Sequence, residues 1–198
     1  MKKFIKNTLV IAVLFTTLLA NANAPLNPLN DARRTTLTLN NVKEGNELLI
    51  KNTLDIVIYK ELIENSGDYT KGFDLTALPN GEYFFELVKD SEIKIIPFHV
   101  SNNMIAFNNG EESTIFIPSI RNKENKVYIS KLSLNQQPLN VEVFYEDIEN
   151  NDFHLIYSEK IEDSSNIARV LNLDENKKGR YRIVTKTEGR TFVDYIQF

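Results

Sequence analysis

Two stretches of this chain decide its fold, because they are the same segment in two versions. Residues 56–85 read IVIYKELIENSGDYTKGFDLTALPNGEYFF, and residues 154–183 read HLIYSEKIEDSSNIARVLNLDENKKGRYRI. Aligned without a gap at an offset of 98, they share nine identical positions in thirty, where unrelated segments share about two. The identities are Ile58/Ile156, Tyr59/Tyr157, Glu61/Glu159, Ile63/Ile161, Glu64/Glu162, Ser66/Ser164, Leu75/Leu173, Gly81/Gly179 and Tyr83/Tyr181. The repeat predicts two copies of one structural unit.

Short alternating or β-branched runs recur along the chain, separated by clusters of Asn, Asp, Gly and Lys. Turn signals every 8–14 residues favour antiparallel sandwiches over strand–helix–strand units. We expect strands near residues 36–39, 47–51, 55–60, 71–75, 82–89, 92–100, 114–117, 126–134, 140–146, 153–160, 167–173, 180–186 and 191–197.

One strand of each copy shows which positions the repeat preserves. The strand with Tyr83 alternates an apolar inward face with a mixed outward one. Its counterpart keeps Tyr181 inward and places Arg180 and Arg182 outward. Agreement on the inward face alone is typical of a half-buried sandwich strand. We therefore expect recognition to lie where the copies differ: at the outward arginines, in the loop 146–152 and at the sheet edges.

The Gly-x-Tyr pair is the sharpest local motif, formed by Gly81 and Tyr83 in one copy and by Gly179 and Tyr181 in the other. Glycine permits a positive φ at the turn into the strand. The tyrosine ring can fill the end of a sandwich while its hydroxyl bonds an upstream backbone group, as in a tyrosine corner. Because both copies carry the pair, we interpret these four residues as structural; the alternative makes the tyrosines ligand contacts.

The N-terminus has the three zones of a secretory signal: a basic start, a short apolar core at residues 9–19, and small residues at alternate positions. The apolar core is shorter than the roughly 20 residues that a membrane span needs. Of two small-x-small sites, we expect cleavage after Ala22, because cleavage after Ala24 would leave Pro25 beside the cut. The residues concerned are Lys2, Lys3, Lys6, Ala20, Ala22 and Ala24.

These observations predict an all-β chain: two tandem small Ig-like antiparallel β-sandwiches after an N-terminal signal peptide. We expect the signal peptide at residues 1–22, a linker at 23–34, the first module at 35–108 and the second at 111–198. The chain has no cysteine, so no disulfide can support the modules. Each module has to be held by its apolar core alone.

Charge argues against two classes of partner. Removal of residues 1–22 takes away three lysines and leaves 20 basic residues against 27 acidic ones, a net charge of −7. A field of this sign repels nucleic-acid phosphates and anionic lipid headgroups. We expect no nucleic-acid partner and no transmembrane segment in the mature chain; a protein or envelope partner is expected, of unknown identity.

Residues suited to catalysis or metal binding are sparse. Without cysteine there is no thiol nucleophile, and His99 and His154 occupy non-equivalent positions of the two copies, with no Ser or Asp motif around them. We expect no catalytic residue and no cofactor. The acidic loop at 146–152 is a weak candidate for Ca²⁺, since hard cations want several oxygen ligands from one loop; the alternative is a solvated hairpin loop. Its candidate ligands are Glu146, Asp147, Glu149 and Asp152.

The runs at residues 56–61 and 73–87, with the segment Asp74-Leu75-Thr76-Ala77-Leu78-Pro79-Asn80-Gly81-Glu82-Tyr83, resemble the C-terminal sorting domains of type IX secretion cargo in Bacteroidota. The resemblance covers about 35 residues of the first copy, and the second copy through the repeat. It implies a small Ig-like β-sandwich and a bacterial envelope context. Such domains are implied to direct cargo across the outer membrane and attach it to the surface.

The leading hypothesis is an exported, non-enzymatic β-sandwich protein that acts as a binding or structural module at the bacterial cell envelope. Its address would be the periplasm, the cell surface or the extracellular space. One alternative makes the C-terminal module a type IX sorting or attachment signal. A lower alternative is a small metal-dependent hydrolase.

Overall fold

The structure, a computed structural model, describes residues 35–108, 110–147 and 152–197. The predicted signal peptide (1–22) and linker (23–34) lie outside the described residues. Every strand pair in the described part is antiparallel, and a single 3₁₀ turn, η1 (Leu75–Ala77), interrupts the strands there. The prediction of an all-β fold is confirmed.

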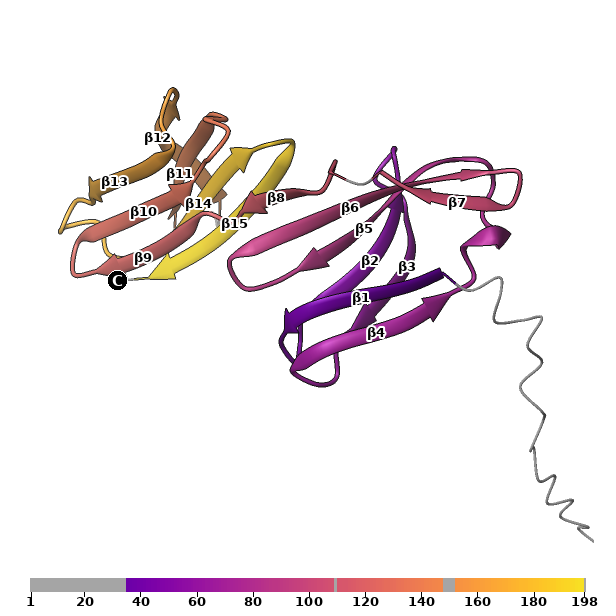
Figure 1. Ribbon diagram of the computed structural model, residues 1–198. Helices are drawn as coiled ribbons and strands as arrows, with labels where there is room; N and C mark the ends of the chain where they lie inside the picture. Colours follow the sequence, from indigo (N-terminus) through magenta and orange to yellow (C-terminus); the bar gives the residue numbers. More distant parts are fainter. Residues whose placement is uncertain (1–34, 109, 148–151, 198) are drawn as a thin grey trace, which may run out of the picture. The chain divides into compact units, whose positions relative to one another are not determined.

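The strands form two sets, and within the described residues no strand pairing joins one set to the other (Figure 1). The first strand set contains β1 (Thr35–Val42), β2 (Glu47–Asn52), β3 (Val57–Leu62), β4 (Gly67–Phe73), β5 (Gly81–Val88), β6 (Glu92–Ser101), β7 (Met104–Phe107) and β8 (Ser113–Phe116). The second strand set contains β9 (Ser119–Lys123), β10 (Lys126–Leu132), β11 (Leu139–Asp147), β12 (Asp152–Ile161), β13 (Asn166–Asn172), β14 (Arg180–Thr187) and β15 (Arg190–Gln197).

In the first strand set, a sheet of order β3-β2-β5-β6-β7, with β8 also on β6, accompanies the two-stranded sheet β1-β4. Apolar side chains from both sheets form one core, in which Leu48, Phe85 and Phe98 are almost fully buried. Alternate residues of β6, and Tyr83, Phe85 and Leu87 of β5, are buried and supply part of this inward face.

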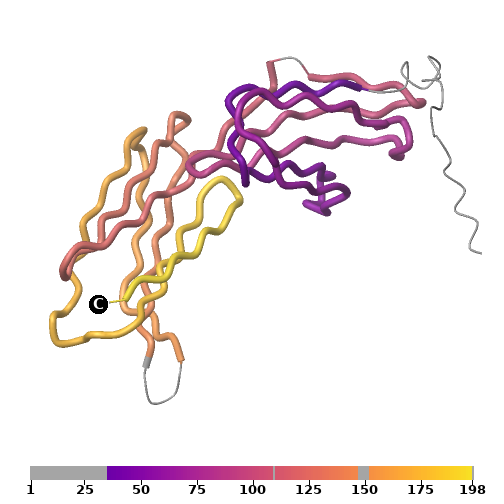
Figure 2. Tube along the Cα trace, turned by 90° about the horizontal axis from the view of Figure 1, so that it is seen from below, coloured from indigo at the N-terminus to yellow at the C-terminus, as the bar shows by residue number. Residues whose placement is uncertain are grey.

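In the second strand set, a sheet of order β12-β11-β14-β15 accompanies the sheet β13-β10-β9 (Figure 2). Its core has Val143, Tyr181 and Ile183 fully buried. Each strand set therefore has a core of its own. The division of the chain into tandem modules at 108–111 stays a prediction; β8, which follows that position, pairs with β6 of the first strand set.

A β-bulge occurs at the same place in both sets. In β3, Ile50 pairs with Tyr59 and Lys51 with Val57, so Ile58 has no opposite residue. In β12, Val143 pairs with Tyr157 and Phe144 with Leu155, which leaves Ile156 unpaired. Both strands lie at a sheet edge. Bulges at edges twist the strand and hinder pairing with another chain, which gives the repeated isoleucine a structural role.

The Gly-x-Tyr residues have matching geometry in the two sets. The Tyr83 hydroxyl donates a hydrogen bond to the carbonyl oxygen of Pro79 at 2.9 Å, and the Tyr181 hydroxyl donates one to that of Lys177 at 2.5 Å. Both bonds span four residues backward along the chain, the pattern of a tyrosine corner. In the part of the chain that the structure describes, no helix has the length and apolar character of a membrane span.

Candidate functional site

The outer face of the four-stranded sheet β12-β11-β14-β15 carries two arginines among aromatic rings. We call Phe144, Phe153, Arg180, Arg182 and Tyr195 together the arginine–aromatic face. Strand register assembles it: Phe144 on β11 lies opposite Arg182 on β14, and Arg182 lies opposite Tyr195 on β15. Phe153 comes from β12, so four strands contribute.

The guanidinium of Arg182 lies between two phenylalanine rings. Its Cζ atom is 4.4 Å from the centroid of Phe144 and 4.6 Å from that of Phe153. Its Nε atom is buried and has no hydrogen-bond partner. A guanidinium stacked on ring faces is held by cation–π attraction and keeps its in-plane N–H groups for a ligand. The two rings thus hold the Arg182 guanidinium in a fixed position, although its Nε atom is too buried to reach an external partner.

Arg180 occupies the neighbouring position on β14 and is held by a carboxylate. Its Nε donates to Glu146 Oε2 at 2.8 Å, and its Cζ lies 5.4 Å from the Phe153 centroid and 5.9 Å from that of Tyr195. The hydrogen bond to Glu146 raises the pKa of Arg180 above its already high value. Arg180 is therefore partly neutralised, whereas Arg182 has aromatic rings as its neighbours.

Exposed apolar side chains surround the two arginines. Tyr195 is 58% exposed, Leu155, opposite Phe144, is 55% exposed, and Val193 on β15 is 49% exposed. A combination of tyrosine, arginine and exposed aliphatic groups on a rigid sheet is typical of the centre of a protein interface. Stacked guanidinium groups suit the planar carboxylates of an acidic partner.

The first strand set has different residues at the corresponding positions. The row Phe144–Arg182–Tyr195 corresponds to Lys51–Phe84–Pro97, through the same register between β2, β5 and β6. At the position of Arg180 stands Glu82, which lies 2.7 Å from the Nδ1 atom of His99. The arginine–aromatic face therefore belongs to the second copy alone.

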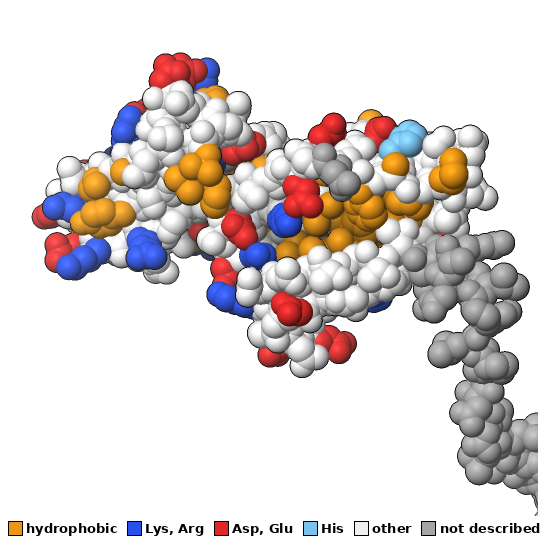
Figure 3. Space-filling view, in the orientation of Figure 1, with side chains coloured by type: hydrophobic (Ala, Val, Ile, Leu, Met, Phe, Trp, Pro, Cys, Tyr) orange, Lys and Arg blue, Asp and Glu red, His pale blue; other side chains and the backbone are white. Residues whose placement is uncertain are grey.

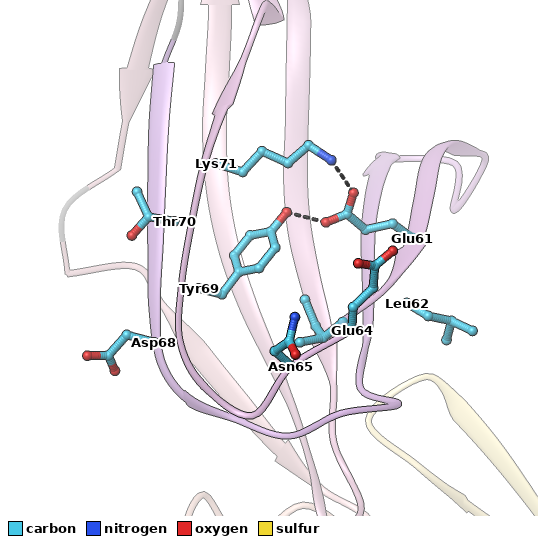
Figure 4. A pocket seen from close by; sticks show the side chains of 9 residues that line it. Glu61, Leu62, Glu64, Asn65, Asp68, Tyr69, Thr70 and Lys71 are labelled. Atoms are coloured by element: carbon cyan, nitrogen blue, oxygen red, sulfur yellow. Dashed lines mark hydrogen bonds and ion pairs between the residues drawn. The ribbon is translucent and has the colours of Figure 1, made fainter.

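A second cluster of polar groups lies on the first strand set and lines a shallow hollow of about 790 Å³. Glu61 on β3 accepts hydrogen bonds from Tyr59, Tyr69 and Lys71, and Figure 4 shows Tyr69 and Lys71 of β4 pointing toward its carboxylate. The Lys71 ammonium also donates to the Tyr59 hydroxyl at 2.7 Å. Because β3 and β4 belong to different sheets, these bonds tie one sheet to the other.

The second copy repeats this cluster with one donor fewer. Glu159 accepts from the Tyr157 hydroxyl at 2.8 Å and from Arg169 Nε at 2.9 Å, while Ile167 stands at the position of Tyr69. Repetition of the tyrosine, the glutamate and the cation indicates a structural bridge between sheets. We therefore assign this cluster to the scaffold.

Ionisation in the two clusters follows from these bonds. Burial alone would raise the pKa of Glu61, but the hydrogen bonds from Lys71, Tyr59 and Tyr69 outweigh it and lower the pKa. Burial and the bond to Glu61 raise the pKa of Tyr69 far above its ordinary value. In Glu159, the bonds from Tyr157 and Arg169 likewise outweigh burial and lower the pKa.

The structure places three residues of the predicted calcium loop at the adjoining ends of β11 and β12. The Glu146 carboxylate accepts a hydrogen bond from Arg180. Asp147 is the last residue of β11 and pairs with Asp152, the first residue of β12. Glu149 lies outside the described residues. Among the residues that the structure does describe, no group of three metal-ligating side chains occurs. Calcium binding by this loop stays a prediction.

The two histidines lie in separate strand sets. His99 on β6 pairs with Glu82, and both side chains are exposed. His154 lies on β12 opposite Tyr145. The structure therefore does not bring the histidines together in one site.

Comparison with known proteins returns little. No family model and no curated protein matches the chain. Among solved structures, the chain is similar to a biofilm associated protein, BSP domain, with a TM-score of 0.29 and 15% identity. The alignment covers 82% of this chain and 27% of that one, so this chain spans about a quarter of that protein's length.

Proposed function

We propose that this chain is an exported, non-enzymatic binding module of the bacterial cell envelope, and that the arginine–aromatic face binds an acidic protein partner. The observation that carries the proposal is Arg182, whose guanidinium is held against two phenylalanine rings on the outer face of the sheet. Protein interfaces concentrate binding energy in arginine and tyrosine side chains of this kind.

The net charge of the mature chain and the predicted signal peptide both support this proposal. The mature chain is acidic overall, so a pair of arginines on one face is a local exception that can orient a partner. The predicted signal peptide supports export. Mass spectrometry of the mature protein, expected to begin at Asn23, tests that part; a chain that retains residues 1–22 would contradict it.

Binding can be tested with envelope fractions of the producing bacterium and the purified mature chain. We expect saturable binding that weakens at least tenfold in Arg182→Ala and in Tyr195→Ala, because removal of an interface centre costs about 2 kcal/mol or more. The matched control is Val170→Ala on the outer side of β13, since Val170 is 52% exposed and lies on the other sheet. Equal binding by wild type and Arg182→Ala would reject the proposed face.

A second candidate function is type IX sorting, favoured by the residue run 73–87 described above. A reporter placed between residue 34 and β1 would keep the C-terminus of the chain intact. Surface display in a type IX-competent host, and its loss in a secretion-deficient strain, would support sorting. A reporter that stays in the periplasm of both strains would reject it.

A further inference from the structure

The two strand sets differ beside one strand, and this difference points to a binding edge. In the described residues, β1 pairs with β4 and with no other strand. Its counterpart β10 pairs with β13 on one side and with β9 on the other. The second strand set thus contains a strand that has no equivalent beside β1.

Register establishes that β1 and β10 correspond. Leu37 lies opposite Lys71, and Ile129 lies opposite Arg169. Lys71 and Arg169 are equivalent in the repeat, so Leu37 and Ile129 occupy the same place in their sandwiches. Both side chains are buried in their cores.

The strand β9 shows which kind of strand completes a sandwich next to β10, the counterpart of β1. It forms a hairpin with β10 in which Ile120 lies opposite Ile129. Ile120 packs against the second core, and its neighbour Arg121 is exposed. One apolar residue toward the core and polar or basic residues away from it are enough to complete the sandwich.

As far as the described residues show, the first strand set has an opening at the place that corresponds to β9. On the side of β1 away from β4, a hollow of about 230 Å³ is lined by Leu37 of β1, Ile96 of β6 and Phe107 of β7. An ion pair of 2.8 Å between Lys94 and Glu112 stands at its rim. Figure 3 shows hydrophobic side chains gathered on one face of the first strand set.

The residues that precede β1 are ill suited to fill this edge by themselves. A hairpin of the same length as β9–β10 would place Pro28 at the position of Ile120, and proline has no N–H to donate to a ladder. Asn27, Asn30 and Asp31 around it are residue types depleted in strands.

We propose that the outer edge of β1 accepts an extended strand from another protein, which completes the first sandwich as β9 completes the second. Its main chain would pair with β1, and an apolar side chain would enter the hollow against Leu37, Ile96 and Phe107. Basic side chains at its outward positions, like Arg121 and Lys123 in β9, suit a mature chain with 20 basic and 27 acidic residues. This edge is independent of the arginine–aromatic face.

The test uses the mature chain, residues 23–198, and a peptide with the sequence of residues 117–125. Hydrogen exchange followed by mass spectrometry reports the backbone amides of β1. We expect the peptide at millimolar concentration to slow exchange in residues 35–42 at least fivefold. A peptide in which Ile120→Lys is introduced should have no such effect, because a lysine cannot enter the apolar hollow. Exchange in β10, whose edges are already paired, serves as the internal control.

A graft variant sharpens the test. Replacing residues 27–33 by the sequence of residues 119–125 gives β1 a covalent copy of β9 and its turn. In this variant we expect slow exchange in β1 without peptide and no further slowing with it. If the graft variant fails to fold, the peptide experiment on the wild-type chain still tests the proposal.

Three results would overturn the proposal. The peptide could leave exchange in β1 unchanged in the wild type. Deletion of residues 23–34 could accelerate exchange in β1 tenfold, which would assign the edge to the chain's own segment. Sedimentation could show a dimer that the graft abolishes, which would assign the edge to a second copy. Arg182→Ala should leave the peptide effect intact, so failure of this proposal and of the proposed function are distinguishable.

Discussion

Tyr83 and Tyr181 are both buried and make the same backward hydrogen bond, yet one residue before each tyrosine the copies carry opposite charges, Glu82 and Arg180. The same contrast holds across both strand sets. The cores, the edge bulges and the tyrosine–glutamate–cation bridges repeat, whereas the outer sheet faces do not. The comparison shows that the two copies share the residues that pack in the cores and differ in the residues of the outer sheet faces. Sites of recognition are therefore expected among the unmatched surfaces.

The largest expected effects come from the corner tyrosines, and they test whether the two cores are separate units. Tyr181 is fully buried and Tyr83 is 7% exposed. Replacing either by alanine removes a large buried ring, which costs about 3–5 kcal/mol. In scanning calorimetry we expect two transitions, with Tyr83→Ala lowering one and Tyr181→Ala lowering the other. If each variant moved both transitions equally, the strand sets would unfold as one unit.

The next effect separates the two glycines of the corner. Gly81 and Gly179 have similar φ values of 158° and 154°. A Cβ atom added to Gly179 would lie 3.3 Å from the ring of Tyr145, whereas a Cβ atom added to Gly81 would lie 3.7 Å from the ring of Tyr83. We expect Gly179→Ala to cost about 1 kcal/mol more than Gly81→Ala in urea unfolding. Adding Tyr145→Ala should remove that difference. Equal costs for both glycines would contradict the steric explanation.

The smallest effect concerns the two bridges and depends on pH. Because the hydrogen bonds lower the pKa of Glu61 and Glu159, each carboxylate stabilises the fold above its ordinary pKa of 4.5. This contribution is lost as pH falls below 4.5 through the lowered pKa. At pH 7 we expect Glu61→Gln to cost about 1 kcal/mol and Glu159→Gln somewhat less, since Glu61 has three donors and Glu159 two.

Urea unfolding between pH 3 and 7 measures this dependence. The cost of each Glu→Gln change should shrink toward zero at the acid end. A cost independent of pH would mean that the carboxylate charge does not contribute to stability.

Most strands could be predicted from the sequence, because alternation and turn residues are local signals. Two strands were missed. The four residues of β7 stand between two pairs of asparagines and are too few to show a pattern, and β9 has one apolar residue, Ile120, so it shows no alternation. Their places depend on hairpin pairing with the adjacent strands β6 and β10, and this pairing leaves no pattern in the short segments themselves.

The candidate site was predictable in part. The difference between the copies singled out Arg180 and Arg182 as outward residues. Their aromatic neighbours could not be predicted, because Phe144, Phe153 and Tyr195 come from three other strands, and only the register brings them within reach. A register shift of one residue would place those rings on the opposite face.

The amino-acid sequence is enough to predict that this chain is all-β, that it repeats one segment, and that the copies share their inward residues. These properties follow from a two-residue period and from internal identity, which need no knowledge of distant contacts. The tertiary structure was needed to show that Arg182 lies against two rings, that the repeated glutamates tie one sheet to the other, and that β9 supplies a strand with no counterpart beside β1 among the described residues. Each of these depends on which strands become neighbours and in what register, and many distant side chains set that choice together.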